Sequence, residues 1–292
     1  MSPRTRPSNA RSELWLPGLS LGGCVRGAML RDTRHVTLAP EHRFSHYPAT
    51  PLCTISWYLD GEIDMLEPGV TPTLDAPRRP MASRVVFSGP QTNPNVTWNH
   101  GPGYGLMLLL LPDAIQSLTP IDPRQWINRH VDAADVLPAS WLVMCDSVAR
   151  AETDNARFSL IESFLDPLWQ AGRPRQALSA QRYSDWIQGL ALRAATSSVG
   201  RSLRQVERRI LLWAGQPIRE LRGFGRAERA FFDMMARAES MPVDWAGLAI
   251  DNQFSDQSHL CRTSQRITGF SPAALRKRIQ TEEGFWPYRI WQ

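Results

Sequence analysis

Near the C-terminal end the chain reads Phe254-Ser-Asp-Gln-Ser-His-Leu-Cys-Arg262 and continues, after the next few residues, as Gly269-Phe-Ser-Pro272. A serine-aspartate pair can cap the start of a helix, and a glycine shortly before a proline is a typical helix end. Leu260 and Ile267 are spaced for one face of such a helix. The stretch therefore predicts a helix over Asp256–Thr268.

The same pattern occurs once more, about fifty residues upstream. There the chain reads Gly200-Arg-Ser-Leu-Arg-Gln-Val-Glu-Arg-Arg-Ile210, followed by Gly215-Gln-Pro217. This predicts a second helix over Ser202–Trp213, with a serine cap and a glycine stop. Two such helices indicate two helix-turn-helix units, at about residues 186–217 and 244–272.

Each unit needs a supporting helix before its second helix. In the second unit Asp244 is a candidate cap for a short helix that buries Trp245 and Leu248. In the first unit the equivalent, Ala191–Ser198, is short and rich in small residues. The second unit is therefore the better defined of the two.

The segment between the units, residues 217–238, is expected to be helical but interrupted at Gly223 and Gly225. A spacer of this length could hold the two second helices about 34 Å apart, which is one turn of DNA.

Polar side chains near the start of each second helix suit contacts to DNA. Arginine can form two hydrogen bonds to guanine, and glutamine can form two to adenine. The alternative is that these are the solvated faces of ordinary helices, but the repetition of caps, stops and charge favours DNA. The predicted DNA contacts are Arg204, Gln205 and Arg208 in the first unit and Gln257, Ser258 and Arg262 in the second. Of these we expect Arg262 and Gln257 to read bases before the two arginines of the first unit.

Charge is distributed unequally along the chain. Residues 175–292 hold 18 Lys+Arg against 11 Asp+Glu, and residues 1–174 hold 15 against 17, so the net charges are about +7 and −2. A basic half beside a slightly acidic half indicates that only one part meets a polyanion. The dominance of arginine over lysine has a second explanation in genomic base composition.

The N-terminal half alternates short β-forming segments with turn-rich stretches, and helical patterns follow it, including an amphipathic one over Ala156–Gln170. The expected strands are Gly27–Leu38, Leu52–Leu59, Arg84–Ser88 and Gly103–Leu111. We expect residues 1–12 to be a disordered tail, residues 13–172 a sensing or dimerisation domain, and residues 173–292 the DNA-binding domain. The predicted fold class is α+β, an antiparallel β barrel or sheet with packed helices followed by an all-α domain.

Residues 254–262 and 268–272 resemble the C-terminal signature of the AraC/XylS transcriptional regulators, and the resemblance extends over roughly residues 180–283. It implies a cupin-like N-terminal barrel and a regulator that contacts double-stranded DNA through both units. The implied partners are a small-molecule effector, a second copy of the chain in a homodimer, and RNA polymerase if the protein is an activator. Two positions depart from the family pattern: Gln253 stands where a glycine is usual, which predicts a strained φ, and Ser264 replaces a late aromatic.

Other chemistries receive little support from the sequence. Four separated cysteines form no C-x-x-C pair, so we expect reduced thiols and no structural zinc. His35, His42 and His46 lack the spacing of a metal cage. We expect no cofactor and no enzymatic activity; the open alternatives are a metal- or ligand-binding barrel enzyme with an accessory helical domain, and an architectural DNA-binding module.

Aromatic residues mark two further features. Trp57, Tyr58 and Trp98 could line a ligand pocket in the barrel, although aromatic residues on strands are more often core. The tail 285–291, which contains two tryptophans, is expected to fold back on the second unit. No apolar run reaches the length of a membrane span, and we expect a cytoplasmic protein without a secretory signal.

Overall fold

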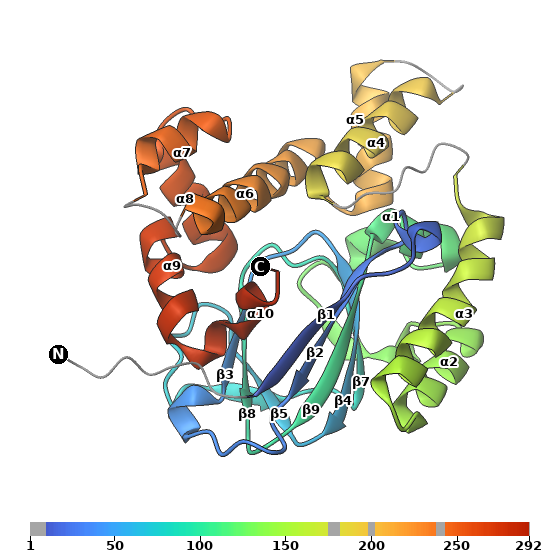
Figure 1. Ribbon diagram of the computed structural model, residues 1–292. Coiled ribbons are helices and arrows are strands. Elements are labelled where there is room, and N and C mark those ends of the chain that lie inside the picture. The colour runs from blue at the N-terminus through green and yellow to red at the C-terminus, as the bar shows by residue number, and fades with distance from the viewer. Residues whose placement is uncertain (1–9, 175–181, 198–201, 238–242, 292) are drawn as a thin grey trace.

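The computed structural model describes residues 10–174, 182–197, 202–237 and 243–291 (Figure 1). The N-terminal part contains two antiparallel sheets, and the C-terminal part is helical, so the predicted α+β class is confirmed. The larger sheet has the strand order β1-β2-β9-β4-β7-β10. Its strands are β1 (Arg11–Trp15), β2 (Val25–Asp32), β9 (Tyr104–Leu110), β4 (Cys53–Asp60), β7 (Val85–Ser88) and β10 (His130–Asp132).

The smaller sheet has the order β3-β8-β5-β6 and completes the β domain. Its strands are β3 (Phe44–Tyr47), β8 (Asn95–Asn99), β5 (Ile63–Leu66) and β6 (Arg78–Pro80). Short 3-10 helices occur within and after the β domain: η1 (Leu19–Leu21), η2 (Pro40–His42), η3 (Pro123–Trp126), η4 (Ala133–Asp135) and η5 (Glu283–Phe285).

Three helices accompany the larger sheet: α1 (Pro112–Leu118), α2 (Ala139–Arg150) and α3 (Asp154–Gly172). Successive side chains on a strand point to opposite faces. On β4, Ile55 and Trp57 belong to the core shared with α2 and α3, and the Trp57 indole donates to the carbonyl of Cys145 on α2 at 3.0 Å. Ser56 and Tyr58, which alternate with them along the strand, line a cavity on the other face. One face of the sheet is thus filled, and the other faces the C-terminal helices.

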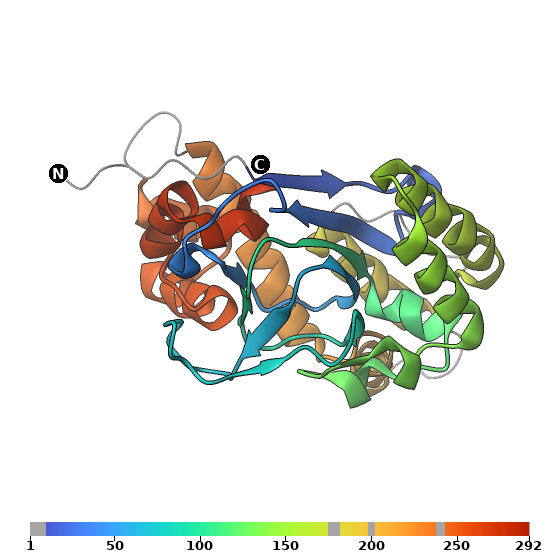
Figure 2. The same cartoon turned by 90° about the horizontal axis from the view of Figure 1, so that it is seen from below.

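The C-terminal helices lie over the open side of the β domain. Figure 2 shows α2 and α3, in yellow-green, on one side of the β domain and the orange and red C-terminal helices on the opposite side. The helices are α4 (Tyr183–Thr196), α5 (Leu203–Ala214), α6 (Ile218–Arg237), α7 (Trp245–Asp251), α8 (Gln257–Thr268), α9 (Pro272–Thr281) and α10 (Trp286–Arg289). We call α4 and α5 the first unit, and α7 and α8 the second unit.

Several expected boundaries need correction. Arg11 and Ser12, assigned to a disordered tail 1–12, are part of β1 and pair with β2, whereas residues 1–9 lie outside the described residues. The strand expected over Gly27–Leu38 ends at Asp32. The supporting helix of the first unit is not the short Ala191–Ser198 but the fourteen-residue α4. This helix buries Trp186, Ile187 and Leu190.

Candidate nucleic-acid interface

Helix α5 begins and ends as its sequence predicts. Ser202 is the N-cap, and its hydroxyl accepts from the backbone N–H of Gln205. The Gln205 side chain completes a capping box because its Oε1 accepts from the Ser202 N–H at 3.2 Å. Gly215 ends the helix at φ 74°. Gln205 was predicted to contact DNA, and in this structure its carbonyl oxygen is instead committed to the cap.

The other two predicted DNA contacts on α5 are free of such bonds. Arg204 and Arg208 are exposed, four residues apart, and therefore on one face of the helix. Neither forms a hydrogen bond or ion pair with another described residue. Leu203 is 74% exposed at the first helical position.

Helix α8 has the same construction. The Asp256 carboxylate accepts from the His259 N–H at 2.7 Å, and this backbone hydrogen bond holds the pKa of Asp256 below its usual range. Gly269 ends the helix at φ 83°. A negatively charged cap is favourable at the positive end of a helix.

The three predicted contacts on α8 are all exposed. Gln257, Ser258 and Arg262 lie in the N-terminal half of the helix, and Arg262 forms no hydrogen bond or ion pair within the part of the chain that the structure describes. His259 instead serves the local structure, because its Nδ1 lies 3.2 Å from the Ser255 hydroxyl and its ring packs edge-on against Phe254. All three are thus accessible, and their contact with DNA stays a prediction.

The turn of the second unit is strained as expected. Gln253 has φ 61°, a conformation that costs a residue other than glycine free energy. Its side chain accepts from Arg229 at 3.3 Å, and the neighbouring Asn252 is buried and donates to Asp233 at 2.8 Å. Ser264, which replaces the family aromatic, donates to the Phe270 carbonyl at 2.8 Å. The departures from the family pattern are therefore accommodated by hydrogen bonds.

Helix α6 connects the two units and is continuous, contrary to the expected interruption. Figure 1 shows it crossing above the β domain, with α4 and α5 at one end and α7 and α8 at the other. Gly223 and Gly225 are both buried within it. A Cβ atom on Gly225 would lie 3.3 Å from Ile187 of α4, and one on Gly223 would lie 3.1 Å from the Arg266 guanidinium of α8. The glycines permit close helix contacts rather than breaking the helix.

The first unit is joined to the β domain by a buried carboxylate. Asp113, on α1, is 5% exposed and accepts from the indole of Trp186 at 2.9 Å and from Arg193 at 3.0 Å. Both donors lie on α4. The hydrophobic core continues from the sheet through α4 and α5 to Ile210. Buried contacts thus join the parts of the chain before and after residue 172. The domain boundary expected there stays a prediction.

The second unit has a core of its own, and among the described residues it and the segment after it contact the β domain in several places, two of which carry hydrogen bonds. Leu248 and Phe254 pack with residues of α6 and α8. The Ala49 N–H donates to the Ile267 carbonyl at the end of α8, at 2.7 Å. The second place is the tail 285–291, which packs on α9 through Phe285 but also sends the Trp286 indole to Ser45 of β3, at 2.9 Å. The tail was expected to fold back on the second unit, and it also bridges to the β domain.

A cavity of about 220 Å³ lies between the sheet and the C-terminal helices. Tyr58, one of the three predicted pocket residues, lines it. Trp57 points into the core on the other face of the sheet, and Trp98 lies outside the cavity, where its indole donates to Pro40 and Arg78 covers its ring at 4.1 Å. Strand alternation separates Trp57 from Tyr58. Trp57 and Tyr58 could line one pocket only if their side chains were on the same face of the sheet, and they are not.

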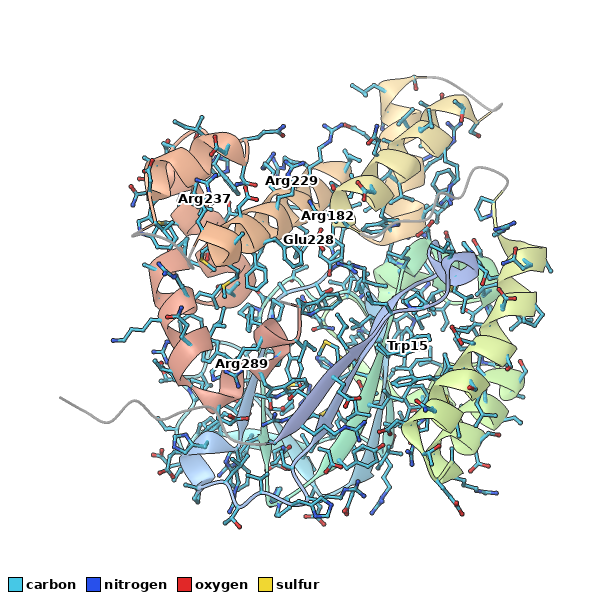
Figure 3. The ribbon with its side chains drawn as sticks, in the orientation of Figure 1. Trp15, Arg182, Glu228, Arg229, Arg237 and Arg289 are labelled. Carbon is cyan, nitrogen blue, oxygen red and sulfur yellow. The ribbon has the colours of Figure 1, made fainter. Side chains whose placement is uncertain are left out.

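Residues that the sequence did not single out close this cavity. Arg26 of β2 and Glu228 of α6 form an ion pair at 3.1 Å, and the other Glu228 oxygen accepts from the Tyr183 N–H at 2.7 Å. Burial raises the pKa of Glu228, and Arg26 opposes that rise. In Figure 3, Glu228 is labelled on the side of α6 that faces the β domain. Glu228 is a lone glutamate on the otherwise apolar face of an arginine-rich helix, and this pattern could have identified it from the sequence.

The three N-terminal histidines do not gather. His35 and His42 are exposed, whereas His46 stacks on Phe285 with the ring centroids 4.5 Å apart. Burial, aided by the positive charge of Arg278, lowers the pKa of His46 to about 4. Among the described residues no three His, Cys, Asp or Glu side chains are grouped to hold a metal ion. The four cysteines are free thiols.

No helix in the described part of the chain is both long and apolar enough to cross a membrane. No family model matches the chain, and no curated protein matches it.

The solved structures to which the chain is similar include the following three. ToxT from Vibrio cholerae O395 is 12% identical, over 80% of this chain and 92% of that chain, with a TM-score of 0.36. Wild-type ToxT from Vibrio cholerae strain SCE256, with an unsaturated fatty acid bound, is 9% identical over 96% and 98%, with a TM-score of 0.36. The AraC-like transcriptional activator CuxR is 11% identical over 92% and 93%, with a TM-score of 0.21.

Proposed function

We propose that the protein is a sequence-specific transcription regulator of the AraC/XylS type, which binds double-stranded DNA through α5 and α8. One observation carries this proposal. Two helices, α5 and α8, each with a side-chain N-cap and a left-handed glycine at the end, present exposed arginines without ion pairs among the described residues, and α6 joins their units. Arginines free of internal partners are available to phosphates and guanine edges.

The roles of the two helices differ in this proposal. On α8, Gln257 and Arg262 supply base contacts, with Ser258 beside them. On α5, Arg204 and Arg208 supply phosphate contacts and the affinity that they bring. Gln205 keeps its cap and contributes to DNA binding by fixing the start of α5.

The β domain supplies regulation in this proposal. Its cavity is lined on the other side by α6 and α8, so a bound effector would contact the DNA-binding units directly. Half-exposed leucines on the outer face of α3, Leu160 and Leu168, suit a second copy of the chain. RNA polymerase would be a partner if the protein activates transcription.

The test is selection of bound sites from random DNA with the full-length protein. We expect a shared motif with two half-sites about 10 base pairs apart, because successive major grooves on one face of DNA are separated by one turn. Arg150→Ala, an exposed arginine on α2, should leave the motif and affinity unchanged. Recovery of no shared motif, with affinity that depends only on DNA length, would contradict the proposal.

A further inference from the structure

The cavity between the sheet and the C-terminal helices has walls from both halves of the chain. Strand residues such as Met29 and Met107 form one wall, and Phe224, Phe231 and Ile267 of α6 and α8 form another. These side chains are apolar, so the cavity favours an apolar ligand. Its volume of about 220 Å³ lies below the about 300–1,000 Å³ typical of pockets for drug-sized ligands, so we expect a ligand of about ten non-hydrogen atoms.

The cavity carries no uncompensated charge. Among the described residues that line it, the acidic and basic side chains are Arg26, Glu228 and His130. Arg26 and Glu228 pair at 3.1 Å. His130 Nδ1 lies 2.8 Å from the Ser88 hydroxyl, and burial lowers the pKa of His130 to about 4, which leaves its ring neutral at pH 7. An anionic ligand would lose its hydration without gaining a free cation.

The Arg26–Glu228 pair is held on several sides. The Arg26 guanidinium lies over the Trp291 ring at 4.6 Å, and Glu228 accepts from the Tyr183 N–H. Both members are about one-tenth exposed. Breaking the pair to bind an anion would leave Glu228 buried without its cation, which is strongly unfavourable.

Two residues on the cavity wall carry a buried polar atom without a hydrogen-bond partner among the described residues, the Tyr288 hydroxyl and the Nε of Arg26, whose guanidinium already pairs with Glu228. Tyr288 of α10 is 5% exposed and lines the cavity, and its hydroxyl has no hydrogen-bond partner among the described residues. The Tyr183 hydroxyl, which also lines the cavity, is paired with the Thr50 hydroxyl at 3.1 Å. A buried hydroxyl without a partner is unfavourable, and a ligand that offers a hydrogen bond would relieve this cost.

We propose that this cavity binds a neutral, mainly apolar small molecule whose single polar group, a hydroxyl or a carbonyl, hydrogen-bonds to the Tyr288 hydroxyl. This inference rests on the proposed function in one respect, since it names the chemical class of the effector. The Arg26–Glu228 pair is then the device that selects neutral ligands over carboxylates.

The test compares octan-1-ol with octanoate, which share a chain and differ in charge, by calorimetric titration of the full-length protein at pH 7 without DNA. We expect saturable binding of one octan-1-ol per chain and at least tenfold weaker binding of octanoate. Equal or tighter binding of octanoate, or no saturable binding of octan-1-ol at millimolar concentration, would overturn the proposal.

Two variants assign the selectivity to named residues. Tyr288→Phe should weaken octan-1-ol binding about fivefold, the effect of one net hydrogen bond, without lowering the thermal unfolding temperature, because it removes an unpaired hydroxyl. Glu228→Gln keeps an acceptor for the Tyr183 N–H but frees the charge of Arg26, and it should strengthen octanoate binding at least tenfold. An unchanged octan-1-ol affinity in the first variant or an unchanged ligand preference in the second would contradict the assignment.

Because no DNA is present, the outcome is independent of the proposed function. A protein that binds octan-1-ol but selects no DNA motif would refute the regulator and keep the cavity assignment. A protein that selects a motif but binds neither probe would refute the cavity assignment and keep the regulator.

Discussion

In the first unit, Trp186 and Ile210 are buried in the same core as the larger sheet, whereas in the second unit Leu248 and Phe254 are buried in a core formed with α6. The first unit is fixed to α1 by a buried ion pair. The second is held to the β domain by the Ala49–Ile267 backbone hydrogen bond and apolar contact, and the segment after α9 adds the Arg31–Glu283 ion pair and the Trp286–Ser45 hydrogen bond. Two similar units thus differ in how firmly they are attached to the β domain. We expect the second unit, which has its own core, to be the one that moves when a ligand binds in the cavity.

The largest expected effect comes from removing the carboxylate that fixes the first unit. Asp113→Ala leaves Arg193 and the Trp186 indole without their acceptor, and we expect a loss of about 3–5 kcal/mol in the free energy of unfolding. Urea unfolding should show one shifted transition, because the first unit shares its core with the sheet. Asp122→Ala, which removes an exposed helix cap, is the control and should cost about 1 kcal/mol. Equal losses in the two variants would contradict a special role for Asp113.

Acid should loosen the second unit. The pKa of His46 is about 4 in the folded chain and 6.5 when unperturbed, so between these values the unfolded state binds a proton that the folded state does not. Stability should therefore fall as the pH drops from 6.5 towards 4, by up to about 3 kcal/mol from this group.

His46→Phe keeps an aromatic ring against Phe285 but cannot be protonated. Unfolding measured in urea at pH 7 and pH 4.5 should show a smaller loss in this variant than in the unchanged protein. The pKa of His130 is also lowered, to about 4, so His130 contributes the same loss of stability at low pH in both proteins. Identical pH dependence in the two proteins would exclude His46 as a source.

In DNA binding the two units should separate by the kind of contact. Arg262→Ala should cost about 1–3 kcal/mol and relax specificity at one base position. Arg208→Ala should weaken all sequences alike and reduce the slope of log affinity against log salt by about 1. Titrations with the selected site, with point-substituted sites and at several salt concentrations measure both. A base-specific loss for Arg208→Ala would reverse the assignment.

The smallest expected effect concerns the turn of the second unit. Gln253→Gly relieves the strain at φ 61°, and we expect a gain of about 1 kcal/mol in the free energy of unfolding. The opposite change at a comparable φ, Gly269→Ala at 83°, should cost about 1 kcal/mol. Thermal unfolding of both variants measures the pair, and a destabilised Gln253→Gly would show that the hydrogen bond with Arg229 outweighs the strain.

Much of the candidate interface could be predicted from residues that are close in sequence. The exposed positions of Arg204, Arg208, Gln257 and Arg262 follow from helical periodicity and two caps. Gln205 shows a feature that periodicity does not predict, because its Oε1 accepts in the capping box; its contact with DNA stays a prediction. Gly223 and Gly225 show another limit, since a glycine suggests a break until its neighbouring helices are known.

The sequence by itself determined where α5 and α8 begin and end, because Ser202, Asp256, Gly215 and Gly269 act through hydrogen bonds and backbone conformations within four residues. It also predicted the α+β class. Only the tertiary structure decided how the units attach and where a ligand could lie. Arg26 and Glu228 are 202 residues apart, and Asp113 and Arg193 are 80 apart. Pairs so distant are brought together by the packing of whole elements, which no local pattern specifies.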